Sequence, residues 1–185
     1  LAILLASLAL LCASPITQAA TYYVDFDTGS DSNNGTSTAT PWKHEPGGVN
    51  ATGTSDGPTL TAGDTVKFKG GVVYFGAVIF NRSGTVASPI TYDGNYAGDW
   101  GTGKAIIDGG YVADASCMLS SGSVSNLIVK FFHLRNAGGW ADDHADVLAA
   151  AAGTKTNTAN TGGNGIAFYS SPCQDIYISD LYIER

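Results

Sequence analysis

An internal repeat near the C-terminal end of the sequence constrains the fold most strongly. Shifting the chain by 49 residues aligns 116–136 with 165–185 without a gap. A repeat of this kind is typical of folds that stack copies of one unit. The apolar pairs in this alignment are Cys117/Ile166, Leu119/Phe168, Leu127/Ile176, Val129/Ile178, Phe132/Leu181 and Leu134/Ile183.

Each repeat unit has the pattern of three short strands. Its apolar residues occur in pairs at a spacing of two, separated by turns, as in half-buried strands. The connections do not suit two-residue hairpins, so we expect parallel strands that pair with the neighbouring coil, about 20 to 25 residues per coil. The segments 64–71, 89–92 and 105–110 show the same pattern. The sequence therefore predicts an all-β solenoid with about three to four visible coils.

The repeat is interrupted by an insertion at 137–164. Asp142 or Asp143 can cap a helix there, the following alanines favour it, and Gly153 can end it. We therefore predict a short helix on a long projecting loop. The alternative is a plain two-coil arrangement with a degenerate coil inside the insertion.

Composition excludes several classes of protein. The hydrophobic fraction of 44% is too high for a disordered chain, and 24 glycines suit many turns better than long helices. The formal net charge of -7 argues against nucleic-acid binding, which depends on Lys and Arg at the phosphates.

The N-terminal segment has the pattern of a signal peptide. Residues 1–11 are apolar, a run too short to span a bilayer comfortably, and small residues follow up to Ala19 and Ala20. We predict a signal peptide over 1–19, clipped at its N-terminus because Met and a basic segment are missing. The mature domain, 20–185, is then secreted, extracellular or periplasmic, without a membrane span. Lipidation at Cys12 is the less favoured alternative, because Leu11 stands where such sites have a small residue.

A series of short motifs runs through the chain after the N-terminal segment. They are Tyr22-Tyr-Val-Asp25, Gly29–Thr36, Pro41-Trp-Lys43, Ala62–Val66, Gly70-Gly71, Tyr74, Ser83-Gly84, Pro89-Ile-Thr91 and Ile107-Asp-Gly109. These motifs resemble those of the pectate-lyase-like superfamily. That resemblance implies a right-handed single-stranded parallel β-helix and a carbohydrate-active extracellular protein. The superfamily contains lyases, hydrolases and coils without known catalysis.

In the lyases of this superfamily, Ca²⁺-binding carboxylates and a basic Lys or Arg typically stand on the outward side of the first strand of central coils. The alignment places Met118, Ser120, Ala167 and Tyr169 at those positions, and none is a carboxylate or a base. No lyase catalytic residue can be transferred, and we expect the catalytic residues beyond Arg185, in a longer protein.

The first acidic group is a candidate calcium site. Asp25, Asp27 and Asp31 are closely spaced carboxylates, which hard cations prefer. The twelfth position of the loop is Thr36 where an EF-hand has Glu, so the alternative is a structural turn in which Asp side chains bind the backbone.

A second candidate lies in the insertion. Asp142, Asp143, His144 and Asp146 can bind a cation or a sugar, or they can form a solvated helix start. Trp140 beside them can stack on a sugar ring or pin the loop to the coil.

The third candidate is a basic row. Lys130, His133 and Arg135 alternate with inward residues and should point outward, where they can bind an acidic polysaccharide. Alternatively they form a solvated face paired with Asp180 and Glu184, which lie near the matching places one unit later.

Two cysteines, Cys117 and Cys173, remain in the mature chain. We expect Cys117 in the core and Cys173 in a turn, which makes a bridge between them unfavourable. The function expected from all these features is that of the N-terminal part of a secreted, monomeric, lyase-like protein that degrades acidic polysaccharides. The alternative is a non-catalytic β-helix scaffold or adhesin that binds carbohydrate.

Overall fold

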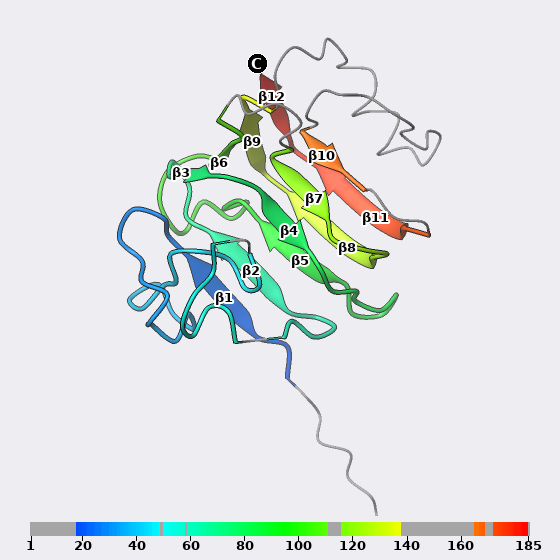
Figure 1. Ribbon diagram of the computed structural model, residues 1–185, viewed down its shortest axis with the longest axis horizontal. Coiled ribbons are helices and arrows are strands. Elements are labelled where there is room, and N and C mark those ends of the chain that lie inside the picture. The colour runs from blue at the N-terminus through cyan, green and yellow to red at the C-terminus, as the bar shows by residue number, and fades with distance from the viewer. Residues whose placement is uncertain are drawn as a thin grey trace, which may run out of the picture.

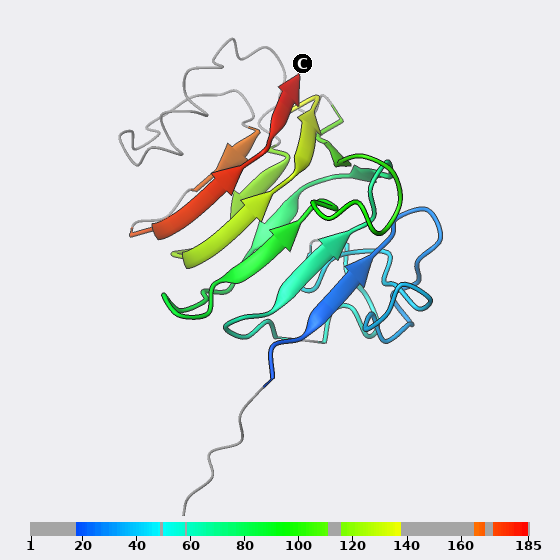
Figure 2. The same cartoon turned by 180° about the vertical axis from the view of Figure 1, so that it is seen from behind.

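The protein is a right-handed parallel β-helix in the computed structural model, which describes residues 18–48, 50–57, 59–110, 116–137, 165–168 and 172–184. All named strands pair in parallel, and successive rungs of the coil stack into three sheets (Figure 1). The reverse view shows the same stacking from behind (Figure 2). The fold expected from the repeat is confirmed.

The five-stranded sheet has the order β1-β2-β5-β8-β11, the four-stranded sheet β12-β9-β6-β3 and the three-stranded sheet β10-β7-β4. The strands of the five-stranded sheet are β1 (Thr21–Val24), β2 (Thr65–Phe68), β5 (Ile90–Asp93), β8 (Ser125–Lys130) and β11 (Gln174–Ser179). Those of the four-stranded sheet are β3 (Val73–Phe75), β6 (Ala105–Asp108), β9 (Phe132–Arg135) and β12 (Tyr182–Glu184). Those of the three-stranded sheet are β4 (Val78–Phe80), β7 (Met118–Ser120) and β10 (Ile166–Ala167).

The core fills the inside of the coil with alternate residues of each strand. Leu127 and Val129 of β8, and Phe132 and Leu134 of β9, are all fully buried. Their counterparts one rung later, Ile176, Ile178, Leu181 and Ile183, are partly buried and pack against the same core. The spacing of two in the sequence thus separates the inside of the coil from the outside, because successive strand residues point to opposite faces.

The predicted register is correct in two sheets and wrong in the third. Leu127 pairs with Ile176, at the predicted offset of 49. In the three-stranded sheet, however, Ile166 pairs with Met118 and not with Cys117. From Ala167 to Gln174 the chain has one residue more than between their partners Leu119 and Ser125, and a slip of one residue exchanges the two faces.

This slip corrects the predicted outward positions. Met118 and Ser120 are buried, although the alignment placed them outside, and Leu119 is the partly exposed residue of β7. Ala167 is also buried. Cys117 lies in the core, as predicted.

The long segment between β1 and β2 covers the first rung of the coil. Trp42 is buried there, and its ring stacks on Tyr22 with 5.0 Å between ring centroids. The amide of Ile79 in β4 donates to Oε1 of Glu45 over 3.4 Å. The carboxyl oxygen of Glu45 thus accepts a hydrogen bond that a backbone carbonyl of a neighbouring strand would otherwise accept. Because this carboxyl group is buried, the pKa of Glu45 is raised.

Three predictions fall outside the described residues. They are the helix in the insertion at 137–164, the signal peptide over 1–19 except its last two residues, and the cluster around His144. Among the described residues, no helix is long and apolar enough to cross a membrane.

Candidate functional site

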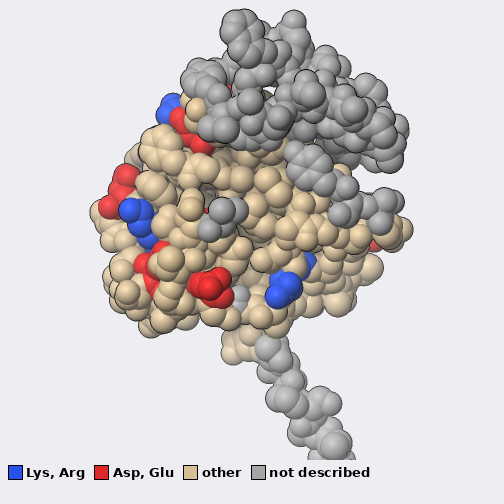
Figure 3. Space-filling view, viewed as in Figure 1, with Lys and Arg blue, Asp and Glu red and all other residues tan. Residues whose placement is uncertain are grey.

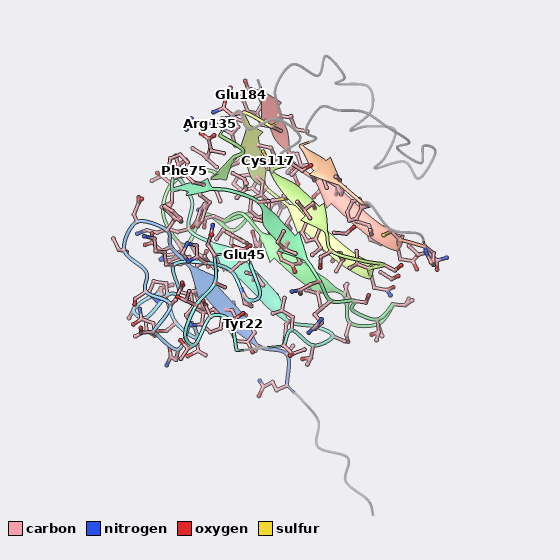
Figure 4. All side chains as sticks on the ribbon, in the orientation of Figure 1. Tyr22, Glu45, Phe75, Cys117, Arg135 and Glu184 are labelled. Atoms are coloured by element: carbon pink, nitrogen blue, oxygen red, sulfur yellow. The ribbon has the colours of Figure 1, made fainter. Side chains whose placement is uncertain are left out.

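The outward side of the four-stranded sheet brings the predicted basic residues next to carboxylates and aromatic rings. Strand pairing arranges its side chains in two rows that run along the coil axis, and together we call them the outer face. The first row is Phe75, Asp108, Arg135 and Glu184, and the second is Val73, Ile106, His133 and Tyr182. Figure 4 shows Phe75, Arg135 and Glu184 following one another from β3 to β9 and β12.

The centre of the first row is an ion pair between neighbouring rungs. Nε of Arg135 donates to Oδ2 of Asp108 over 2.8 Å. The other oxygen of Asp108 accepts from Nδ2 of Asn136 and from the amide of Gly110, each over 2.9 Å. Burial by itself would raise the pKa of Asp108, but these donors outweigh it and lower the pKa. Asp108 is thus an ionised carboxylate with both oxygens occupied.

A second pair joins β9 to the following rung. Nε2 of His133 lies 3.0 Å from Oε1 of Glu184, and the His133 ring meets Tyr182 edge to face at 4.7 Å. The side chain of Glu184 is 38% exposed, so this carboxylate is open to solvent while that of Asp108 is not. Glu184 is the carboxylate of the outer face that a solute can reach.

Two exposed aromatic rings lie on the outer face, one on β3 and one on β12. Phe75 is 58% exposed and Tyr182 is 53% exposed, which is unusual for rings of this size. Three rung steps separate their strands, β3 and β12, or about 14 Å at the spacing of neighbouring strands. The outer face thus offers two apolar rings with hydrogen-bonding groups between them.

The third predicted basic residue lies at the adjacent corner of the coil. Nζ of Lys130, the last residue of β8, is 3.7 Å from Oδ2 of Asp93 in the preceding rung. It also lies 4.8 Å from the ring centroid of Tyr96. Lys130 is partly buried and points outward, as predicted, but it belongs to the five-stranded sheet.

All three predicted basic residues therefore have a carboxylate partner on a neighbouring rung. The partner of Lys130 is Asp93, that of Arg135 is Asp108, and that of His133 is Glu184. The alternative that the basic residues are paired with acidic ones is therefore present, and Glu184 is one of the partners named in that alternative. Asp180 is not such a partner: its backbone carbonyl accepts from Lys104.

The surface shows the same mixture of charges. On the side shown in Figure 3, Lys or Arg atoms lie beside Asp or Glu atoms along the left edge, and most of the remaining described surface is uncharged. Oppositely charged neighbours partly cancel at a distance, so the described part of this side lacks a broad field of one sign.

The candidate calcium residues are engaged with protein donors. Asp25 is buried and binds Nζ of Lys69 over 2.7 Å. Burial would raise its pKa, but hydrogen bonds from Lys69 and Thr28 lower it. Asp27 is exposed, and its amide donates to Asp25 over 3.1 Å. This geometry is that of a turn held by its own side chains.

Asp31 holds a different part of the same long segment. It accepts from Nδ1 of His44 over 2.7 Å, from the amide of His44 over 2.9 Å and from the amide of Lys43 over 3.1 Å. Among the described residues, no group of three or more His, Cys, Asp or Glu side chains can hold a metal ion. Calcium binding stays a prediction.

The acidic cluster Asp142, Asp143, His144 and Asp146, together with Trp140, lies outside the described residues. The residues that sequence reasoning missed are Phe75, Asp108 and Tyr182. Applying the offset of 49 to His133 and Arg135 gives Tyr182 and Glu184, so the repeat carried a signal for two members of the outer face.

Comparison with known proteins gives few matches. No protein-family model matches the chain, and no curated protein matches it. Solved structures of a GH136 lacto-N-biosidase from Eubacterium ramulus are similar. For the native protein the TM-score is 0.55 at 23% identity, covering 88% of this chain and 26% of that enzyme. For the selenomethionine derivative the TM-score is 0.55 at 22% identity, covering 89% and 27%.

The chain thus spans about a quarter of the length of that enzyme. At this level of identity the likeness concerns the fold alone. It supports a parallel solenoid and assigns no residue a role.

Proposed function

We propose that the chain is part of a secreted, carbohydrate-degrading β-helix protein, and that the outer face binds the polysaccharide. The observation that carries this proposal is a pair of exposed rings on the outer face, Phe75 on β3 and Tyr182 on β12, with the polar side chains of β6 and β9 between them. Aromatic faces and paired polar groups recur where proteins bind ligands with both apolar and hydroxyl surfaces. Similarity to a glycoside hydrolase structure supports the same class.

A second candidate is a β-helix that binds carbohydrate without catalysis. The observation in its favour is that the oxygens of Asp108 are already occupied by Arg135, Asn136 and Gly110. A carboxylate in that state is poorly placed to transfer a proton. The lyase chemistry expected from sequence, removal of the proton beside a uronate carboxylate followed by β-elimination, stays a prediction.

Affinity electrophoresis in gels that contain pectate, alginate, xylan, galactan or a soluble cellulose derivative tests binding. We expect at least one polysaccharide to retard the protein. Migration that none of them changes would overturn the proposed function. Assays of the reaction products distinguish the activities. Release of reducing ends without new ultraviolet absorbance would indicate a hydrolase, and absorbance of an unsaturated uronate would indicate a lyase. Retardation in the gel without any product would favour the non-catalytic scaffold.

A further inference from the structure

The charges of the outer face compensate one another. It carries two carboxylates, Asp108 and Glu184, against one guanidinium, Arg135, and one imidazole, His133. The carboxylates thus equal the bases in number, so the face carries no excess of positive charge. An acidic ligand binds best to a cation without a carboxylate neighbour, and both bases of this face lie beside a carboxylate.

The carboxylates also lie beside Arg135, the residue to which an acidic ligand would bind. Glu184 is the most open charged group of the row, while Arg135 lies between Asp108 and Glu184 in the pairing register. The carboxylate of a uronate placed over Arg135 would approach Glu184 as well. Like charges at such distances repel, and desolvation would strengthen the repulsion.

The same groups suit uncharged hydroxyls. Free lone pairs on an exposed carboxylate accept hydrogen bonds from hydroxyl groups, and the remaining N–H groups of a guanidinium donate to them. Tyr182 and Phe75 supply apolar surface against which the carbon–hydrogen face of a sugar ring can pack. The distance between their strands, about 14 Å, corresponds to a short oligosaccharide and exceeds one sugar ring.

We propose that the outer face binds a neutral glycan in an extended conformation, with Tyr182 and Phe75 as stacking platforms and Glu184 and Arg135 as hydrogen-bonding groups. This proposal rests on the proposed function and narrows its ligand class. It replaces the acidic polysaccharide expected from the basic row, because that row is paired with carboxylates.

Isothermal titration calorimetry on the whole chain tests the proposal. The neutral probes are cellohexaose, xylohexaose and mannohexaose, and the acidic probes are oligogalacturonate and oligoalginate of the same length. We expect a neutral hexasaccharide to bind more tightly than either acidic probe, with an affinity that does not change between low and high salt, because uncharged ligands are not screened.

Three tyrosine variants locate the binding. Tyr182→Ala should weaken binding of the neutral probe at least about fivefold, because it removes a stacking ring, while Tyr182→Phe should retain most of the binding. The matched control is Tyr177→Ala, which removes a ring that is 69% exposed on β11 of the five-stranded sheet and should change nothing. Thermal unfolding of each variant checks that the fold is kept.

A charge variant provides an independent arm. Glu184→Gln removes the open carboxylate and leaves His133 and Arg135 in place, so the affinity for oligogalacturonate should rise by up to about fivefold at low salt. Loss of this gain at high salt is part of the expectation.

Two results would overturn the proposal that the glycan is neutral, while leaving the proposed function in place. One is tighter, salt-sensitive binding of an acidic probe by the unaltered chain. The other is binding of a neutral probe that neither Tyr182→Ala nor Phe75→Ala weakens. Failure of every polysaccharide in the electrophoresis would instead overturn the proposed function itself.

Discussion

Phe131 and Asp180 hold the same left-handed backbone conformation at the same place of successive rungs. Their φ angles are 63° and 53°, and each lies in the bend that leads from the five-stranded to the four-stranded sheet. Asn126 and Asp175 form a second such pair, with φ angles of 56° and 53°. Both pairs are 49 residues apart, so the backbone strain recurs with the repeat. Asn and Asp tolerate this conformation better than most residues, whereas Phe at such a position is an outlier.

The left-handed conformation of Asn126 can be tested by substitution. Asn126→Ala should destabilise the protein by about 1–2 kcal/mol, because alanine pays the full cost of this backbone region. Asn126→Gly is the matched control, since it also removes the amide that binds the Gly84 carbonyl yet tolerates the same φ. Thermal or urea unfolding measures both. Equal stability of the two variants would contradict the backbone explanation.

The inward position of Val129 can be tested with a charge. Val129→Asp should destabilise by about 3–5 kcal/mol, because it places an unpaired carboxylate in the core of the coil, where Val129 is fully buried. Ile128→Asp is the control, as the adjacent residue points outward and is only partly buried. An unchanged unfolding curve for Val129→Asp would show that the assignment of inward residues is wrong.

Glu45 gives a prediction for pH dependence. Because burial raises its pKa, the contribution of this group to stability is complete below the unfolded pKa, about 4.3, and is lost as the pH rises through the folded pKa. Glu45→Gln stays neutral and keeps an acceptor for the Ile79 amide. Its melting temperature relative to the unaltered protein should therefore increase from about pH 4 to about pH 8. Asp56→Asn, at an exposed carboxylate, serves as the control, and a difference that is constant with pH would refute the prediction.

The close approach of two rungs explains why position 94 is occupied by glycine. A Cβ at position 94 would collide with the backbone carbonyl oxygen of Phe131, which cannot move without shifting the next rung. Gly94→Ala should cost about 1–3 kcal/mol, as other overpacked sites do. Gly57→Ala should be nearly neutral, since its Cβ would lie 3.6 Å from the Thr54 carbonyl oxygen. Similar melting temperatures for the two variants would argue against the contact.

The repeat predicted much of the fold. It correctly gave parallel strands, the inward residues of β8 and β9 and the outward direction of His133 and Arg135. It failed at β7 and β10, where one extra residue in a turn shifts the register by one. Cys117 and Met118 are adjacent and both buried, so either could be matched with Ile166. A gapless alignment therefore cannot detect a shift of one residue here.

The candidate site was less accessible to sequence reasoning. Asp108 lies 27 residues before Arg135, and two strands, β7 and β8, lie between their strands in the chain. Nothing in the local pattern around either residue indicates the other, so the sequence leaves two interpretations of the basic row open, a surface for acidic ligands and a face paired with acidic residues. The pairing register places each base beside a carboxylate, which favours the second.

The sequence by itself determined that this chain coils in short parallel strands, because alternating apolar residues at a fixed offset can be buried together only by stacking. The tertiary structure alone decided which charges meet. Electrostatic partners in a solenoid come from neighbouring rungs, so their identity depends on the length of every turn between them. The compensated charge of the outer face, and hence the class of glycan that we propose for it, follows from that register.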